Sequence, residues 1–258
     1  MNQKRNIKIT LEYDGTNYSG WLDQKDCITV QSVVTKAVYD LTGQAVEING
    51  CSRTDKGVHA VGYVISFIDS SSIPIEKYVV ALNSFLPQDI RAKEAIGVSL
   101  DFHATFSKSN KTYRYYFYSS TTQVPLLNNR AWYIGDRNGC DVQAIATALD
   151  VMTGEHDFSS FRAMGGMSKT TVRTIYSINF TCENFYNVKM YCLEVTGNGF
   201  LYNMVRIIAG TVAEFVKGRM DPNNLTKVLN SGRRELAGPT APACGLYLWK
   251  VDYLSSQN

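Results

Sequence analysis

The sequence predicts a mixed α/β (α+β) fold of two similar lobes, each of which combines strands with flanking helices. Strand-like alternation and helical spacing of apolar residues both occur in each half of the chain. The 258 residues, 45% of them hydrophobic and 19% charged, suffice for one large domain or for two half-size lobes. We expect an N-terminal lobe over residues 1–105 and a C-terminal lobe over residues 106–258.

In the first half, apolar residues at every second position over 7–13 predict a strand. Apolar residues over 30–41 recur with helical spacing, with Thr29 placed as the N-cap and Gly43 near the C-terminus. The other elements expected in this half are a strand around 46–48, a strand over 61–67 and a helix over 74–84. We expect the segment that joins the two halves, 88–106, to be a packed crossover.

The second half opens with an aromatic run in which Tyr113, Tyr115 and Phe117 would point to one face of a strand. Asp141 is placed to cap a following helix. The expected elements are that helix over 142–152, two strands within 170–195, a helix over 203–217, a short helix from Asp221 and a last strand over 247–253.

The densest group of ionisable residues, Arg53 to His59, lies between two strand-like runs and is most simply a loop. Asp55 stands beside Arg53 and Lys56, and nearby cations favour the charged form of a carboxylate. An ionised carboxylate suits a nucleophile or an ion-pair partner better than a general acid. From spacing alone, an Asx-type turn before Gly57 explains Asp55 more simply than catalysis does.

The sequence shows no pattern typical of a metal site or of a membrane-spanning segment. The six cysteines are scattered, the three histidines lack the spacing of a metal site, and no apolar run approaches the roughly 18 residues needed to span a bilayer. We therefore expect reduced thiols, no metal and a cytoplasmic protein. The net charge of +3 and the sixteen tyrosines allow a nucleic-acid partner, since aromatic rings stack on bases and cations hold phosphates.

The segment Gly197–Arg206 places two glycines before a predicted helix, as a phosphate-binding loop would. Two glycines are a weak signal, and a turn with an N-cap is the simpler interpretation. Arg206 borders the apolar face of that helix. A half-buried arginine needs an anion, and both Asp55 and an RNA phosphate are candidates.

The chain resembles the TruA family of tRNA pseudouridine synthases along nearly its whole length. The most specific motif is Arg53–Ala60 (RTDKGVHA). The other motifs are Tyr13-Asp-Gly-Thr16, Gly20-Trp21, Asn83, Leu86-Pro87, Phe102-His-Ala104, Tyr113-Arg-Tyr115, His156-Asp-Phe158, Phe161, Gly199-Phe-Leu201, Met204-Val-Arg206, Ala241-Pro242 and Gly245-Leu246.

The resemblance implies the pseudouridine-synthase fold, with mixed, largely antiparallel sheets flanked by helices around a central basic cleft. It implies the isomerisation of uridine to pseudouridine, with Asp55 as the catalytic nucleophile. It also implies that Arg53 displaces the target nucleotide, that Tyr113 stacks on the base and is a candidate for assisting its deprotonation, and that Arg206 pairs with the aspartate. Lys56 and His59, in the same motif, are added as candidate substrate contacts. The family uses no cofactor or metal and acts as a homodimer on tRNA, at positions 38, 39 and 40 of the anticodon stem-loop.

Three residues depart from the family pattern: Ser52 replaces a usual Gly, Lys56 a small residue such as Ala, and Leu22 a usual Gln. Two other functions stay open. A catalytically silent tRNA-binding or tRNA-folding protein would share the basic aromatic surface without needing Asp55. A glycosidase-like enzyme would combine Asp55 with a second carboxylate such as Asp157 and would release base or sugar.

Overall fold

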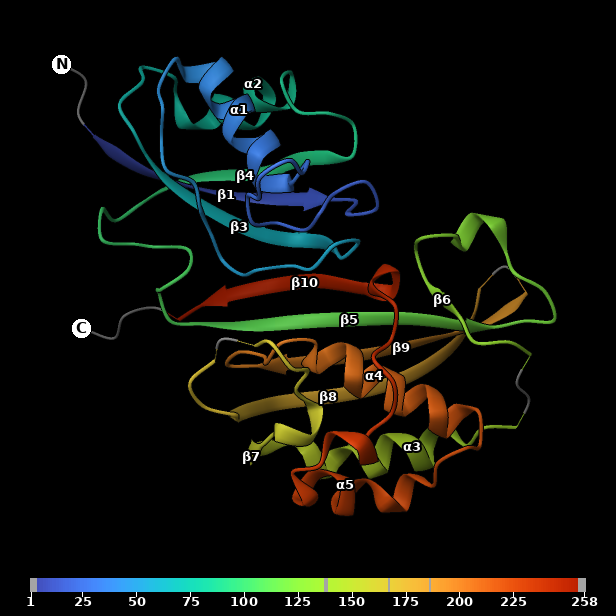
Figure 1. Cartoon of the computed structure of the whole chain (residues 1–258). Coiled ribbons are helices and arrows are strands. Elements are labelled where there is room, and N and C mark those ends of the chain that lie inside the picture. Colours follow the sequence, from blue (N-terminus) through green and yellow to red (C-terminus); the bar gives the residue numbers. More distant parts are fainter. Residues whose placement is uncertain (1–3, 137–138, 167, 186, 255–258) are drawn as a thin grey trace. The chain divides into compact units, whose positions relative to one another are not determined.

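The chain forms two compact units in the computed structural model, which describes residues 4–136, 139–166, 168–185 and 187–254 (Figure 1). The N-terminal unit consists of Met1–Ser109 together with Tyr247–Asn258, and the central unit consists of Asn110–Leu246. Within the described residues, no helix combines the length and the apolar character needed to cross a membrane.

The N-terminal unit is built on a sheet of four main strands. Strand β1 (Arg5–Tyr13) pairs antiparallel with β3 (His59–Asp69) on one side and with β4 (Ile90–Val98) on the other. The C-terminal strand β10 (Leu246–Tyr253) pairs in parallel with β3, and the short β2 (Asn49–Gly50) pairs with β3 antiparallel. The apolar positions of the alternating pattern in β1 are fully buried, which is why this segment forms a half-buried strand.

Two helices cover this sheet, and Figure 1 shows them on the same side of β1 and β4. Helix α1 (Val30–Thr42) begins at Thr29, whose side chain accepts a hydrogen bond from the Ser32 backbone, and it ends at Gly43, which has a left-handed φ of 68°. These are the expected caps. Helix α2 (Tyr78–Asn83) packs against β4.

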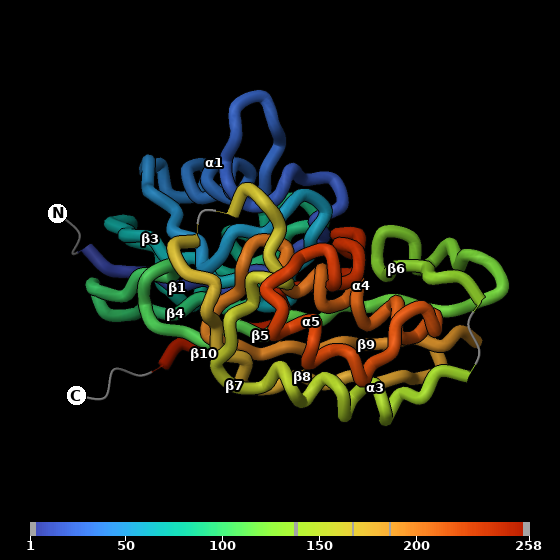
Figure 2. The backbone as a smooth tube through the Cα atoms, turned by 60° about the horizontal axis from the view of Figure 1, so that its bottom comes forward, coloured from blue at the N-terminus to red at the C-terminus, as the bar shows by residue number. Residues whose placement is uncertain are grey.

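The central unit contains mainly antiparallel strands flanked, within the described residues, by three α-helices. Neighbouring strands are, in order, β5 (Ser109–Ser119), β9 (Val188–Gly197), β8 (Val172–Phe185) and β7 (Gly154–Asp157), with β6 (Trp132–Tyr133) parallel to β5. The helices are α3 (Val142–Leu149), α4 (Met204–Val216) and α5 (Leu225–Ser231). Helix α3 packs on β8, and Figure 2 shows the two side by side from a second direction.

The predicted fold class is confirmed, because both units combine mostly antiparallel strands with flanking helices. Several elements differ from the expectation. The crossover expected over 88–106 contains β4, whose outer half is largely exposed and so lacks a clear apolar alternation. The strand expected around 46–48 lies instead at Asn49–Gly50, and the helix expected over 74–84 begins as a 3-10 turn, Ile75–Lys77.

The last strand groups differently from the expected boundary at residues 105 and 106. We placed it with the C-terminal lobe, but β10 pairs with β3 through Tyr247 and His59, and all of its residues except Leu246 belong to the N-terminal unit. The two shortest of the strands in the central unit, β6 and β7, were not expected either. Such strands contain too few residues to show the alternation of apolar and polar positions by which a strand is predicted.

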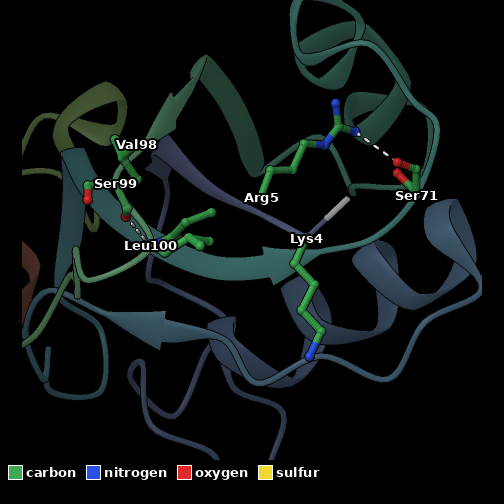
Figure 3. A pocket seen from close by; sticks show the side chains of 7 residues that line it. Lys4, Arg5, Ser71, Val98, Ser99 and Leu100 are labelled. Atoms are coloured by element: carbon green, nitrogen blue, oxygen red, sulfur yellow. Dashed lines mark hydrogen bonds between the residues drawn. The ribbon is translucent and has the colours of Figure 1, made fainter. Parts of the chain in front are cut away.

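A cavity of about 550 Å³ lies in the N-terminal unit at the start of β1 and the end of β4. Figure 3 shows Arg5 and Lys4 pointing away from each other at this site, with Arg5 directed toward Ser71. The Arg5 guanidinium also donates to the buried Asp69, with Nε 2.9 Å and Nη2 2.7 Å from Oδ2, and to the Ile73 carbonyl. These bonds tie the start of β1 to the end of β3 and to the segment that follows it, which makes Arg5 a structural residue.

Acid should weaken the Arg5–Asp69 contact. Burial alone would raise the pKa of Asp69, but hydrogen bonds from Ser71, Arg5 and Tyr78 more than offset it and lower the pKa below the ordinary 3.8. A lowered folded-state pKa contributes stability above pH 3.8 that is lost as pH falls through the folded value. We expect Asp69→Asn to destabilise the fold at neutral pH and to reduce the loss of stability in acid, measured by urea unfolding at a series of pH values.

The matched control is Asp252→Asn, which removes a carboxylate from an exposed ion pair with Lys250. This variant should follow the wild-type pH dependence, because exposed pairs contribute little. If Asp69→Asn and the wild type lose stability in parallel as the pH falls, Asp69 is not one of the groups that link stability to acid.

Candidate active site

A tight turn of the backbone carries Asp55. The Val58 N–H donates to the Asp55 carbonyl at 3.1 Å, and Gly57, at the third position of this turn, has a φ of +79°. Side chains other than glycine rarely adopt that conformation, so the Asp-Lys-Gly-Val order matches a turn that needs glycine at its third residue. The Asp55 side chain is half-buried, whereas the neighbouring Arg53 and Lys56 are exposed.

The turn rests against a second loop, 14–21, by direct backbone contact. The Trp21 N–H donates to the Thr54 carbonyl at 3.1 Å. A Cβ on Gly20, whose φ is +87°, would lie 2.5 Å from that same carbonyl oxygen, and one on Gly15 would lie 1.9 Å from the Val58 carbonyl oxygen. Both glycines are therefore required for the close approach, which fixes the backbone on either side of Asp55.

Buried aromatic residues support the turn from below. The Tyr13 hydroxyl and Thr54 Oγ1 are 2.8 Å apart in a buried hydrogen bond, and the Tyr63 hydroxyl donates to the Ser52 carbonyl. The Trp21 ring stacks on Tyr63 with ring centroids 4.1 Å apart. Because Tyr13 ends β1 and Tyr63 lies within β3, the sheet itself positions the residues that precede Asp55.

His59 begins β3 and is buried. Its ring stacks on Tyr247 of β10 at 4.7 Å, and its Nδ1 lies 3.0 Å from the Gly15 N–H and 3.1 Å from Asp14 Oδ1. The Gly15 contact needs an unprotonated Nδ1 and the Asp14 contact a protonated one. We favour the unprotonated nitrogen, because Asp14 Oδ1 already accepts from the Thr16 backbone and hydroxyl. In the N-terminal unit His59 thus joins the 14–16 turn to β10.

Tyr113 belongs to the central unit, on β5. Its side chain is buried and meets the edge of the Phe200 ring in a T-shaped contact, with centroids 5.2 Å apart and planes at 87°. The expected alternation holds, since Tyr113, Tyr115 and Phe117 are all buried. Tyr113 is therefore held by its strand and by the segment that precedes α4.

Arg206 lies in the first turn of α4 and is half-buried. Its Nε donates to the Ala241 carbonyl at 2.8 Å and its Nη1 donates to Asn203 Oδ1 at 2.9 Å. Asn203 itself adopts a left-handed conformation, with φ of 59°, immediately before the helix. Two contacts therefore orient the Arg206 guanidinium: one to Asn203, just before the same helix, and one to Ala241, which is distant in the sequence.

Helix α4 and the 238–241 segment approach each other at backbone distance. A Cβ on Gly210 would lie 1.7 Å from the Pro239 carbonyl oxygen, and one on Gly238 would lie 2.6 Å from the Thr211 backbone. The Ala241 N–H donates in turn to the Arg206 carbonyl at 3.1 Å. This contact brings the Ala241 carbonyl to the Arg206 side chain.

The structure thus groups Arg53, Asp55, Lys56 and His59 on one unit, and Tyr113 with Arg206 on the other. The second carboxylate considered for glycosidase chemistry, Asp157, is exposed at the end of β7. A hydrogen bond from Thr171, followed by bonds from Ser159, lowers the pKa of Asp157. A general acid needs the opposite shift, so Asp157 is unsuited to that role.

Sequence reasoning missed the residues that hold the candidate site in place. Gly15, Gly20 and Gly210 act through backbone contact, and Ala241 acts through a carbonyl, so none has a side chain that signals chemistry. The family resemblance did include Gly15, Gly20 and Ala241 in its motifs, but it gave no structural reason for them. Their positions are now explained by the approach distances.

The chain matches known proteins along most of its length. A family model described as tRNA pseudouridine synthase matches residues 9–107 and 148–254. A protein of Acetivibrio thermocellus called tRNA pseudouridine synthase A is 44% identical over 249 residues, which cover 96% of this chain and 100% of the relative. The protein of that name from Ruminiclostridium cellulolyticum is 43% identical with the same coverage. Tyr113 lies between the two segments that the family model matches.

The contact at Gly210 predicts that alanine at this position destabilises the protein, which is the opposite of the usual effect of Gly→Ala in a helix. Glycine inside a helix normally costs about 1 kcal/mol relative to alanine, so Gly→Ala should stabilise α4 on propensity alone. Because the Pro239 backbone occupies the space, we expect Gly210→Ala instead to lower the free energy of unfolding by about 1–3 kcal/mol, measured by urea unfolding.

Gly43→Ala serves as the matched control, since a Cβ there meets nothing within 4 Å and only the left-handed φ opposes it. That variant should lose about 1–2 kcal/mol. A Gly210→Ala protein as stable as the wild type or more stable would show that α4 and the 238–241 segment are not held at this distance.

Proposed function

The chain belongs to the tRNA pseudouridine synthase family, and we propose that it converts uridine to pseudouridine at positions 38, 39 and 40 of the tRNA anticodon stem-loop. The observation that carries this proposal is the Arg53–Ala60 motif, which the structure forms as a glycine-dependent turn with a half-buried carboxylate between two exposed cations. A positioned carboxylate of this kind is the group that the reaction requires.

In the proposed mechanism Asp55 is the nucleophile. Its carboxylate attacks the target uridine at the base or at the sugar and forms a covalent bond there, the glycosidic carbon–nitrogen bond breaks, and the uracil turns. A carbon–carbon bond then joins the uracil to the ribose, and the bond to Asp55 breaks, which restores the free carboxylate. The ring carbon that forms this bond loses its proton, and the ring nitrogen that was released gains one. Substrate and product have the same atoms, so the reaction as proposed needs no cofactor and no metal.

The two cations beside Asp55 are proposed to act on the RNA. A uridine stacked in a helix cannot reach a carboxylate, so it has to leave the stack at a cost of about a few kcal/mol. The exposed Arg53 is proposed to displace the target nucleotide, and the exposed Lys56 to contact a phosphate. His59 was also expected to contact substrate, and its burial and its contacts with Asp14 and Gly15 favour a positioning role instead.

Two residues of the central unit complete the proposed machinery. Tyr113 is proposed to stack on the displaced base and to assist its deprotonation, and Arg206 to pair with the catalytic aspartate. Support for these roles comes from the family motifs and from the way each side chain is held, Tyr113 by Phe200 and Arg206 by Ala241 and Asn203. A side chain locked by its neighbours loses little conformational entropy when substrate binds.

The partners proposed are tRNA and a second copy of the chain. A homodimer in which the two chains together hold one tRNA follows from the resemblance, and light scattering of the purified protein with and without tRNA tests it. The cytoplasm is the proposed location. All six cysteines are free thiols, which fits a reducing compartment.

Replacing Asp55 should separate catalysis from binding. We expect Asp55→Asn to lower pseudouridine formation by about 10⁴-fold or more, because the neutral amide is no nucleophile, while affinity for tRNA and its salt dependence stay near wild type. The measurement is pseudouridine mapping at single-nucleotide resolution on an unmodified tRNA transcript, with filter binding of the same RNA. Asp157→Asn is the matched control and should keep full activity.

The outcome distinguishes the alternatives. Full activity in Asp55→Asn would remove this carboxylate from the mechanism. Tight tRNA binding by the wild type without any pseudouridine would indicate a silent binding or folding protein. Release of free uracil would indicate glycosidase chemistry.

Tyr113→Phe should distinguish stacking from proton transfer. Phenylalanine keeps the ring and the edge contact with Phe200 but lacks the hydroxyl. If the hydroxyl assists deprotonation, kcat falls about 10²-fold or more while KM is nearly unchanged, because assistance by a positioned acid or base group is typically of this size. Tyr113→Leu, which removes the aromatic ring as well, should also weaken RNA binding. Equal single-turnover rates for Tyr113→Phe and the wild type would assign Tyr113 to stacking alone.

A further inference from the structure

Two arginines of the central unit converge near the segment that precedes α4. Arg162 follows the 3-10 turn Ser159–Phe161, and Arg173 lies near the start of β8. A Cβ on Gly166 would lie 3.3 Å from Arg162 Nε and 3.0 Å from the Cβ of Tyr202. A Cβ on Gly199 would lie 3.9 Å from Arg173 Nε. Arg173 therefore borders Gly199 of the loop 197–203, and Arg162 borders Gly166, which in turn lies against Tyr202 of the same loop.

Neither arginine forms an ion pair with a carboxylate in the part of the chain that the structure describes. Arg162 donates to the Gly166 carbonyl, and Arg173 Nη1 donates to the carbonyls of Thr170 at 3.0 Å and Val172 at 2.6 Å. Other arginines of this unit do have acidic partners. Arg114 Nε lies 2.5 Å from Glu194, and Arg233 Nε lies 2.7 Å from Glu235.

Both side chains are half-buried, so each positive charge has lost part of its water. Burial, and then the positive charge of Arg162, lower the pKa of Arg173. Partial burial of two like charges is unfavourable unless an anion offsets it. Carbonyl oxygens hold the guanidinium groups in place but carry no full negative charge, which leaves a site whose electrostatics suit an added anion.

This arginine pair is continuous with the residues proposed to act on the target uridine. Phe200, next to Gly199, meets the Tyr113 ring at 5.2 Å. The Tyr202 carbonyl accepts from the Ala163 N–H at 3.1 Å, and Asn203 orients Arg206. The loop 197–203 thus borders Arg173 directly and Arg162 through Gly166, and it also contacts Tyr113 and Arg206.

We propose that Arg162 and Arg173 together bind a backbone phosphate of the substrate RNA next to the target uridine. This inference rests on the proposed function, because it takes the RNA as substrate and Tyr113 as the residue that stacks on the base. In RNA, one ribose separates the phosphate of a nucleotide from its base. A phosphate site beside the tyrosine that stacks on the base therefore suits the arrangement of a single nucleotide. Paired guanidinium groups are well suited to phosphate oxygens, which accept parallel N–H bonds.

The test measures binding of an anticodon stem-loop RNA at several salt concentrations, in the Asp55→Asn background so that no turnover occurs. We expect Arg162→Gln and Arg173→Gln each to weaken binding about 10-fold, and the slope of log K against log salt to fall by about 0.7–0.9 for each phosphate that is no longer neutralised. The matched control, Arg233→Gln, removes an exposed arginine paired with Glu235 and should change neither quantity. Circular dichroism melts verify that each variant is folded.

A modified RNA then locates the contact. Methylphosphonate linkages, which are uncharged, replace the phosphate on the 5′ or the 3′ side of the target uridine. One of the two should weaken binding to the Asp55→Asn protein but have no further effect when Arg162 and Arg173 are both glutamine. Additive losses of affinity, or unchanged salt slopes in folded single variants, would overturn the proposal.

The result is separable from the proposed function. If the otherwise unaltered protein forms pseudouridine but the arginine variants bind RNA as the Arg233→Gln control does, only the phosphate site fails. If the unaltered protein neither binds the RNA nor forms pseudouridine, the proposed function fails first. Variants that bind RNA normally but no longer bind an acidic protein would assign the arginines to that protein and reject the RNA site.

Discussion

The contact on which the candidate site depends is the close approach of two backbones, the 14–21 loop and the 54–58 turn. The Trp21 N–H bonds the Thr54 carbonyl, and glycine at positions 15 and 20 leaves room for the Val58 and Thr54 oxygens. The backbone that carries Asp55 is therefore positioned by main-chain contacts, in addition to the hydrogen bonds from the Tyr13 and Tyr63 hydroxyls. This explains how departures from the family pattern are accommodated. Lys56 and Leu22 have exposed side chains, and Ser52 takes part through its carbonyl, which any residue supplies.

In the central unit, too, a close contact between two backbone segments positions a charged side chain, although other elements form the contact. Gly210 of α4 faces the Pro239 carbonyl at a distance that only glycine permits, and the next residues of that segment bring the Ala241 carbonyl to Arg206. In both units a charged side chain of proposed function is placed by glycine-dependent backbone contact. Such contacts are stiff, because protein interiors are close-packed and backbone atoms cannot move aside as flexible side chains do. Stiffness of this kind lets a site hold its geometry before substrate arrives.

The sequence was sufficient to predict those features of the fold that depend on neighbouring residues. The caps of α1 at Thr29 and Gly43 and the alternation of β1 follow from neighbouring residues, and the structure confirms them. Edge strand β4 could not be recognised, since its outer half is largely exposed and shows no regular alternation of apolar and polar residues, and its partners in β1 lie 77 to 92 positions away in the sequence. Asp55 was found because its motif concentrates charge, whereas Gly15 and Gly210 contribute only the absence of a side chain. A sequence pattern can indicate reactive groups, but close approach is a property of the folded chain.

The exposure of the cations bears on how the proposed reaction begins. A nucleophilic carboxylate works best where water is excluded, yet Asp55 is only half-buried and stands between two exposed cations, Arg53 and Lys56. In the protein alone these groups are solvated, so the water has to be displaced by the substrate itself. Contacts to the RNA backbone would then do more than hold the substrate, because the binding energy they supply also drives the desolvation of the carboxylate. On this argument the arginines proposed to bind phosphate and the aspartate proposed to react contribute to the same step, although they lie far apart in the sequence.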